Sequence, residues 1–199
     1  MRNKVKVVLI DDEPFPYQET LHRHGYHITK KDDIDDIQSI EVYDIVLCDI
    51  KGVGRKLNAT LEGAHVISEI RKRYPFKYII AYSGETFNPT FNRHFQMADK
   101  SIKKDADLED WLETLDKATE QTLAPYSQWQ KMKKALLERE IPLLDVMRLE
   151  DKFVNSILKK DRESFITDKA LIHLPRETQQ LLKDFSKQII LKLLLAAAS

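Results

Sequence analysis

Cysteine is almost absent from this chain of 199 residues, in which Cys48 is the single example. One thiol excludes a disulfide within the chain and is typical of a reducing compartment. A long hydrophobic run is also missing, because the most apolar stretch, residues 189–198, is short and interrupted by Lys192. A membrane-spanning helix needs about 20 apolar residues, so we expect none. No apolar signal region opens the sequence, and we expect a cytoplasmic protein.

The sequence has no surplus of charge, since 32 Lys and Arg residues balance 32 Asp and Glu residues. Residues 120–199 have a small basic excess, with 14 basic side chains against 11 acidic ones. Proteins that bind nucleic acid usually cluster many basic side chains on one face, so we do not expect nucleic acid as a partner. A content of 42% hydrophobic and 32% charged residues is typical of a globular protein with exposed helix faces.

Short apolar runs alternate with amphipathic segments through residues 1–122. The runs predict five strands, at residues 4–10, 26–29, 44–49, 77–83 and 100–102. The helices predicted around them are at residues 14–25, 32–42 and 62–74, from residue 88 with Phe91 and Phe95 on one side, and at 107–122. Such alternation implies parallel pairing with right-handed crossovers. The sequence therefore predicts an α/β fold with a five-stranded parallel sheet, doubly wound by helices on both faces.

Residues 123–199 show no strand signal and form a second predicted domain of three to four helices. The predicted helices are at residues 127–140, from Pro142 onward, within 165–174, and from Arg176 onward. The side chains expected in their core are Trp129, Met132, Phe153, Phe165 and Phe185. The apolar stripe predicted for the helix after Pro142 consists of Leu143, Met147, Val154, Ile157 and Leu158. Residues 189–195 are more apolar than one stripe needs, so we expect them to lie in a partner interface, most simply that of a homodimer.

Polar residues stand where several of the predicted strands end. Asp11 and Asp12 follow the first strand, Asp49 ends the third and Ser83 ends the fourth. The carboxyl ends of parallel strands all lie at the same edge of a sheet, and functional sites of open α/β sheets lie at that edge. Taken singly, each residue is more often a cap, a turn or a solvated surface residue. Their value as a site depends on their occurring together.

The motifs resemble the receiver domain of two-component response regulators, a flavodoxin-like α/β fold. The matching segments are Leu9–Pro14, Asp44–Asp49, Ala81–Gly84 and Ala98–Lys104, within about residues 3–120. They occur in the order of the family, each at the end of its expected strand.

The resemblance implies that Asp49 accepts a phosphoryl group from a histidine kinase or a phosphotransfer protein. It implies a Mg²⁺ ion held by Asp11, Asp12, Asp49 and the backbone carbonyl of Lys51, because clustered carboxylates need their charge neutralised and oxygen ligands suit this ion. In phosphoryl transfer, catalysis is mostly positioning and charge stabilisation. Self-catalysed phosphorylation and dephosphorylation would be the only chemistry, with no conventional enzyme activity.

Two further residues take roles by the same resemblance. Ser83 would donate a hydrogen bond to a phosphoryl oxygen, with Gly84 leaving room for it. Lys104 would pair with the phosphoryl group, although the neighbouring Lys103 remains an alternative for this role.

Several positions depart from the family pattern. Asp105 stands where receivers usually have a proline after the lysine, and without proline a cis peptide is far less favourable. Ser101 replaces the usual aromatic switch residue. The segment after Asp49 lacks the usual Met-Pro and is longer, and Lys51 is placed to act as a second cation. These changes indicate a divergent receiver with an altered phosphorylation lifetime or altered partners.

Other interpretations of the sequence remain open. A pseudo-receiver would keep the carboxylates but serve as a scaffold, and a DNA-binding regulator would use the helical region to read duplex DNA. A phosphatase of the haloacid-dehalogenase type would need a second Asp two residues after Asp49, where Lys51 stands. A histidine phosphotransfer bundle would need a histidine in mid-helix, but His173 precedes Leu174-Pro175 at a predicted helix end.

Overall fold

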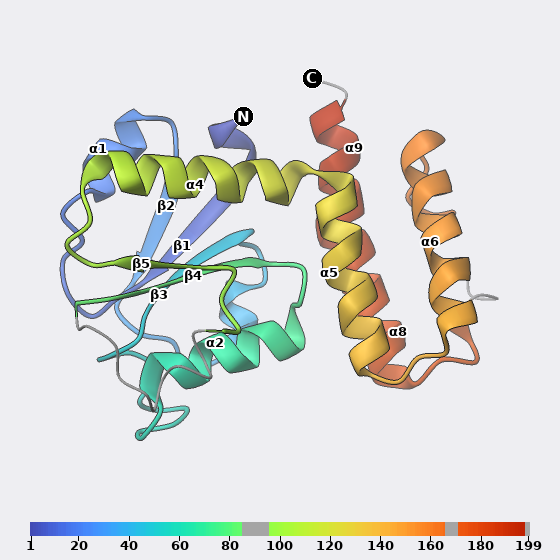
Figure 1. Ribbon diagram of the computed structural model, residues 1–199, viewed down its shortest axis with the longest axis horizontal. Coiled ribbons are helices and arrows are strands. Elements are labelled where there is room, and N and C mark those ends of the chain that lie inside the picture. The colour runs from blue at the N-terminus through green and yellow to red at the C-terminus, as the bar shows by residue number, and fades with distance from the viewer. Residues whose placement is uncertain (85–95, 166–170, 198–199) are drawn as a thin grey trace. The chain divides into compact units, whose positions relative to one another are not determined.

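The computed structural model describes residues 1–84, 96–165 and 171–197, with the side chains of 195–197 excluded (Figure 1). The chain forms two compact units. The N-terminal unit contains residues 1–73 and 77–122, and the helical unit contains residues 74–76 and 123–199. The helix predicted from Asn88-Pro89, with Phe91 and Phe95, lies outside the described residues.

A five-stranded parallel sheet forms the centre of the N-terminal unit, with the strand order β2-β1-β3-β4-β5. The strands are β1 (Lys6–Ile10), β2 (His27–Lys31), β3 (Ile45–Asp49), β4 (Tyr78–Ser83) and β5 (Lys100–Lys103). The three inner strands are apolar and almost wholly buried, as expected when both faces of a parallel sheet are covered. The predicted fold class is therefore confirmed.

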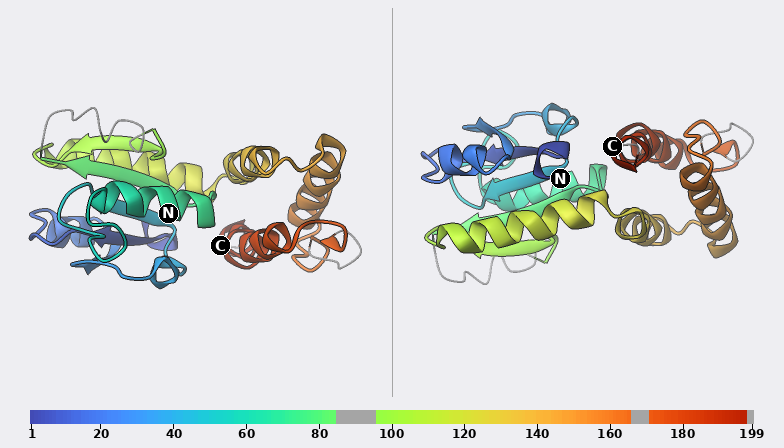
Figure 2. Two further views of the ribbon diagram at one scale, coloured as in Figure 1. Left: turned by 90° about the horizontal axis from the view of Figure 1, so that it is seen from below. Right: turned by 90° about the horizontal axis from the view of Figure 1, so that it is seen from above.

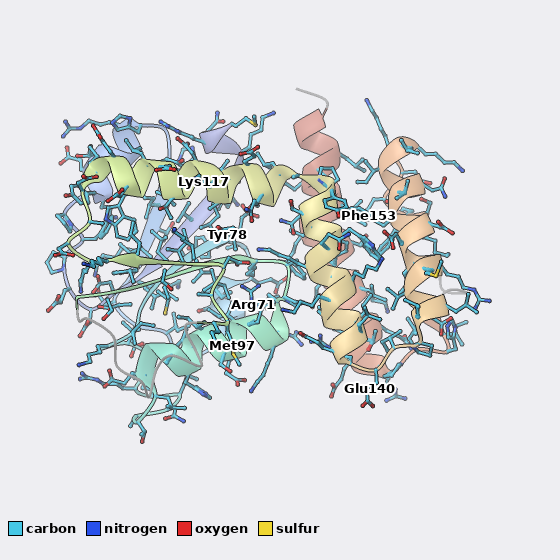
Figure 3. All side chains as sticks on the ribbon, viewed as in Figure 1. Arg71, Tyr78, Met97, Lys117, Glu140 and Phe153 are labelled. Carbon is cyan, nitrogen blue, oxygen red and sulfur yellow. The ribbon has the colours of Figure 1, made fainter. Side chains whose placement is uncertain are left out.

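Helices cover both faces of this sheet. They are α1 (Gln18–Arg23), α2 (Glu62–Arg73) and α4 (Leu108–Leu123). Figures 1 and 2 show α2 and α4 on opposite faces. Arg71, at the end of α2, donates to the backbone oxygens of Met97 and Lys77 and to the carboxylate of Asp99, and so ties α2 to the chain around β4 and β5 (Figure 3).

The helix predicted for residues 32–42 was wrong, since only a 3₁₀ turn, Ile37–Ile40, forms there. The cause is local hydrogen bonding by aspartates. Asp33 Oδ1 accepts from the backbone N–H groups of Ile34 and Gly54, and Asp36 Oδ1 accepts from that of Gln38. Such bonds offer the backbone an alternative to helical pairing. The apolar residues of the segment still reach the core, because Ile34 and Ile40 are buried.

The helical unit contains α5 (Pro125–Glu138), α6 (Leu143–Leu158), α8 (Arg176–Phe185), a π-helical turn (Ser186–Ile190) and α9 (Leu191–Ala197). Its core is aromatic. Phe153 of α6, labelled in Figure 3, stacks on Trp129 of α5 at 5.2 Å between ring centroids. Phe185 contacts both rings and also Phe76 and Phe165. Burial of Trp129, Met132, Phe153, Phe165 and Phe185 confirms the predicted core residues.

The apolar stripe predicted for α6 lies on the exposed side of the helix. Leu143, Met147, Val154 and Leu158 are exposed, whereas the buried apolar residues are Val146, Leu149 and Phe153. The helix has two apolar faces, and periodicity alone does not tell which one faces the core. One prediction for this unit was wrong: the partner interface expected at the C-terminal segment does not include Ile189, Ile190 and Leu193, because these side chains are buried within the chain itself. None of the described helices is long and apolar enough to cross a membrane.

Candidate functional site

Three carboxylates meet at the carboxyl edge of the sheet. Asp11 follows β1 and Asp49 ends β3, and the register that pairs Ile10 with Cys48 brings the two together. Oxygen atoms of Asp11, Asp12 and Asp49 all lie within 4.8 Å of one another. Asp11 is 0% exposed and Asp49 is 5% exposed, while Asp12 is exposed to solvent. The parallel sheet thus brings side chains that are far apart in the sequence together in one acidic cluster.

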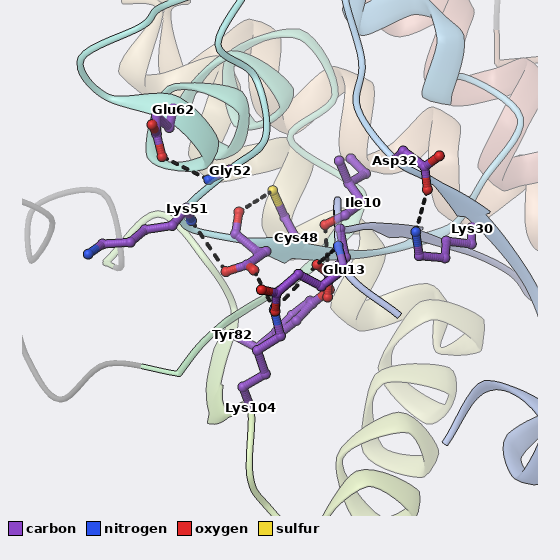
Figure 4. A network of polar contacts seen from close by, with 12 residues as sticks. Ile10, Glu13, Lys30, Asp32, Cys48, Lys51, Gly52, Glu62, Tyr82 and Lys104 are labelled. Atoms are coloured by element: carbon purple, nitrogen blue, oxygen red, sulfur yellow. Dashed lines mark hydrogen bonds and ion pairs between the residues drawn. The ribbon is translucent and has the colours of Figure 1, made fainter. Parts of the chain in front are cut away.

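Lys104, in the loop after β5, supplies the positive charge (Figure 4). Its Nζ lies 2.9 Å from Asp49 Oδ2, 3.3 Å from Asp11 Oδ1 and 2.8 Å from Glu13 Oε2. The Lys104 N–H donates to the Ser83 carbonyl oxygen at 3.0 Å, which fixes the lysine beside the end of β4. Lys103 is exposed on β5, so Lys104 is the lysine that the fold brings to Asp49.

The hydroxyl of Tyr82 completes the buried side of the cluster. It donates to Asp11 Oδ2 at 2.8 Å, while the Glu13 N–H donates to Asp11 Oδ1 at 2.8 Å. Burial and the nearby Asp11 carboxylate raise the pKa of Tyr82 far above its usual range, so the phenol stays protonated and remains a donor. Our sequence analysis missed this residue. The available signal was the second of two tyrosines in the strand KYIIAYS, directly before Ser83 at the carboxyl edge.

Opposing effects act on the charges of Asp49 and Lys104. Burial raises the pKa of Asp49, and the hydrogen bonds from Lys104 and from the Lys51 N–H only partly counteract this. For Lys104, burial lowers the pKa, but the hydrogen bonds to Glu13 and Asp49 outweigh burial and raise it overall. Both pKa values are raised, but burial prevails at Asp49 and the hydrogen bonds prevail at Lys104, because Asp49 is the more deeply buried partner. Lys104 is therefore a permanent cation beside a carboxylate that ionises less readily than an exposed one.

The loop after Asp49 closes tightly on the cluster. The Lys51 N–H donates to Asp49 Oδ1 at 3.3 Å, and the Lys51 side chain is exposed. Gly52 has φ +82°, and a Cβ atom there would stand 2.3 Å from Asp12 Oδ1. A Cβ atom at Gly63 would stand 1.9 Å from the Asp49 backbone oxygen. Both positions require glycine for close approach, a requirement that our sequence analysis missed.

Ser83 and Gly84 lie at the same edge. Ser83 is the last residue of β4 and pairs in register with Lys103 of β5. Because Tyr82 pairs with Asp49, Ser83 stands one position beyond Asp49 in the neighbouring strand. At Gly84 a Cβ atom would lie 3.9 Å from Lys104 Cδ, without a clash. The fold therefore gathers all the residues of the predicted site at one edge.

The donor set fits a hard divalent cation. Asp11, Asp12 and Asp49 offer carboxylate oxygens only, which suit Mg²⁺ with its oxygen ligands and retained waters. Lys104 Nζ contacts the carboxylates of Asp11, Glu13 and Asp49, and Asp12 lies in the same acidic cluster. A second positive charge at this place would relieve their mutual repulsion.

No family model matches the sequence, and no curated protein matches it. Among solved structures, the chain is similar to the receiver domain of NtrX from Brucella abortus, with 21% identity over 58% of this chain and 98% of that one, at a TM-score of 0.49. It is similar to NtrX solved with ATP, with 18% identity over 77% of this chain and 35% of that one, at a TM-score of 0.50. It is also similar to the response regulator TrrA from Thermotoga maritima in complex with Mg²⁺-BeF, with 23% identity over 57% of this chain and 98% of that one, at a TM-score of 0.46.

The N-terminal unit has the flavodoxin-like fold that receiver domains share. The strand order and the doubly wound helices are those of this fold. The likeness is one of fold alone. The chain spans about a third of the longer NtrX structure. What the site does must be argued from its own geometry.

Proposed function

We propose that this protein is a cytoplasmic two-component response regulator that accepts a phosphoryl group on Asp49 from a phosphohistidine of a histidine kinase or phosphotransfer protein. The observation that carries the proposal is the 2.9 Å contact between Lys104 Nζ and Asp49 Oδ2, inside the acidic cluster at the carboxyl edge of the sheet. One buried nucleophile, one fixed cation and two further carboxylates are the parts that acyl phosphate formation requires.

In the proposed reaction, an Asp49 carboxylate oxygen forms a bond to phosphorus while the phosphorus–nitrogen bond of the donor breaks. The electron pair of that bond stays with the imidazole, which leaves neutral after taking up a proton. Lys104 stabilises the negative charge on the phosphoryl oxygens, and the Ser83 hydroxyl donates a hydrogen bond to one of them. The catalytic contribution is therefore positioning and charge stabilisation, as in other phosphoryl transfers.

Asp11, Asp12, Asp49 and the backbone carbonyl of Lys51 would hold the Mg²⁺ ion, which when bound neutralises charge on the carboxylates and on the phosphoryl group. Asp12 is the exposed member and the best placed for direct ligation from the solvent side. Asp11 is held on one oxygen by the Glu13 N–H and on the other by the Tyr82 hydroxyl. These bonds fix its position before any ion arrives.

The helical unit, residues 123–199, is the proposed output region. Ser101 is exposed on β5 where receivers usually carry an aromatic residue, so the output would not depend on burying a ring at that position. We propose that the helical unit transmits the state of the site through contact with a partner protein or a second copy of this chain.

The test is phosphorylation by a small phosphodonor such as acetyl phosphate, followed by intact mass. Labelling should require Mg²⁺ and disappear in Asp49→Asn. Asp105→Asn is the matched control, because Asp105 is exposed next to Lys104 and should leave labelling unchanged. Absence of both labelling and Mg²⁺ binding in the wild type would refute the proposal. Labelling that persists in Asp49→Asn would refute the choice of acceptor.

A further inference from the structure

Helix α6 carries an apolar stripe that nothing in the described chain covers. The α6 stripe consists of Leu143, Met147, Val154 and Leu158, which are 58%, 53%, 46% and 76% exposed. At 3.6 residues per turn these four side chains fall within about 60° of arc, so they form one face. The stripe is separate from the face that packs into the helical unit. Its size and continuity are those of a surface that binds another molecule.

The spacing of the α6 stripe is symmetric about a point between Glu150 and Asp151. Leu143 and Leu158 are equally distant from that point, and so are Met147 and Val154. If two copies of α6 lie antiparallel, Leu143 meets Leu158 of the second copy and Met147 meets Val154 of the second copy. A two-fold dimer requires such self-complementarity, because the same patch must serve both chains.

The apolar surface continues from the stripe toward α5. A groove of about 230 Å³ lies between α5 and α6, with Val154 and Leu158 in its lining and the exposed Tyr126 at one side. Leu144, also exposed, borders the stripe at its other end. Six half-exposed apolar side chains at about 60–120 Å² each offer on the order of 500 Å². This is below the ~800 Å² per chain of a standard stable interface, so the dimer should be weak and concentration-dependent.

We propose that the α6 stripe is the contact between two copies of this chain, with the two α6 helices antiparallel. The proposal deepens the assembly role proposed for the helical unit and is independent of phosphorylation at Asp49. It names one occupant, because a partner of a different sequence would not require the stripe to be symmetric.

The acidic residues at the centre of the stripe predict how the affinity of the dimer depends on salt. The symmetry places the exposed Asp151 of each copy beside its counterpart, where like charges repel. Glu150, on the other side of the centre, is already paired with Lys133 at 2.9 Å within the chain. Asp151 should therefore limit the affinity of the dimer, and added salt should tighten it by screening that repulsion.

Sedimentation velocity from about 1 to 500 µM tests the contact. The wild type should form a weak dimer, Met147→Glu and Leu158→Glu should each weaken it at least tenfold, and Asp151→Asn should tighten it severalfold. Val42→Glu is the matched control, since Val42 is 63% exposed in the N-terminal unit and should change nothing. Circular dichroism checks that each variant is folded. A monomer at every concentration, or a Met147→Glu variant that dimerises like the wild type, would overturn the proposal.

Cysteine crosslinking fixes the orientation. Cys48 is buried, so an added surface cysteine reports without interference from the natural thiol. Asp151→Cys should form a disulfide-linked dimer under mild oxidation, because the two-fold centre brings the two positions within disulfide distance. Leu137→Cys, on α5 and outside the lining of the groove beside the stripe, should not. Crosslinking of both variants to the same extent would refute the antiparallel arrangement. Asp49→Asn should dimerise normally while losing its label, which separates this proposal from that of the phosphoacceptor.

Discussion

The hydroxyl of Tyr82 offers the most direct test of how the site is built, and Tyr82→Phe removes it with little change in volume. Asp11 is fully buried, and its Oδ2 atom accepts the Tyr82 hydrogen bond at 2.8 Å. Loss of a hydrogen bond to a buried charged group costs about 1.5–3 kcal/mol. We expect the free energy of unfolding, measured in urea without Mg²⁺, to fall by an amount in this range.

The same substitution should weaken Mg²⁺ binding. Tyr82 does not touch the metal, but it orients Asp11, and loss of such outer-shell partners costs about 10–100-fold in metal affinity. Isothermal titration of Mg²⁺ into the folded protein measures this directly. The expected result is a dissociation constant at least tenfold higher in Tyr82→Phe.

Tyr78→Phe is the matched control, because Tyr78 is a buried tyrosine at the opposite end of the same strand. Its removal alters stability without reaching the acidic cluster, so the Mg²⁺ dissociation constant should stay at the wild-type value. Equal Mg²⁺ affinity in Tyr82→Phe and the wild type would refute the positioning role of the hydroxyl. Equal loss of affinity in both variants would show a general loosening of β4 instead.

Three other outcomes follow from the same geometry. Gly52→Ala should lower the free energy of unfolding by about 1 kcal/mol because of the positive φ at this position, and it should weaken Mg²⁺ binding because the added Cβ displaces Asp12. Gly25→Ala is the control, since Gly25 has a similar φ without a close contact, and it should affect stability alone. Burial raises the pKa of Asp49, so the folded state holds this proton more tightly than the unfolded chain and stability falls as pH rises from the ordinary Asp pKa through the raised one. Urea titrations should therefore show Asp49→Asn more stable than the wild type at pH 7, with the difference shrinking in acid, and an unchanged difference would contradict the assignment. Lys104→Met removes the cation that contacts Asp11 and Asp49, which are also proposed to hold Mg²⁺. Mg²⁺ should therefore bind more tightly, while labelling by acetyl phosphate should slow. Faster labelling would contradict the role of Lys104.

The sheet and the position of the site could be predicted from the sequence because they depend on short-range patterns and one topological rule. Apolar runs such as KVVLI and IVLCD need only their composition to be recognised as buried strands. Once the strands are parallel, their carboxyl ends must share one edge. Asp11 and Asp49 therefore lie close together, as predicted, although 38 positions separate them in the sequence.

The remaining errors concern features that depend on partners distant in the sequence. Residues 32–42 have helical periodicity, but the Asp33 carboxylate binds the N–H of Gly54, which lies 21 residues further along. In α6 both faces are apolar, and the buried one is the face that carries Phe153, which stacks on Trp129 of α5. Periodicity is a property of one segment, so it does not contain this information.

The choice between Lys103 and Lys104 shows the same limit on a finer scale. Adjacent residues in and after a short strand point in different directions, and which one faces Asp49 is set by the bond from the Lys104 N–H to the Ser83 oxygen. That bond depends on the register between β4 and β5, which pairs Ser83 with Lys103. A charge pattern of several lysines in a row does not reveal the register.

Tyr82 also bears on how the site can communicate with the rest of its unit. Its ring contacts Trp111 of α4 at 5.6 Å between centroids, and Phe15, in the loop after β1, contacts Trp111 at 5.0 Å. The hydroxyl of Tyr82 donates to Asp11, so one side chain joins the acidic cluster to the aromatic contact with α4. Ser101, in contrast, is a small exposed residue on the edge strand with no ring to bury. The aromatic side chain beneath the site is therefore Tyr82, which is buried in β4 and not exposed on β5. There it is held to the acidic cluster by a hydrogen bond and to α4 by its ring contact with Trp111.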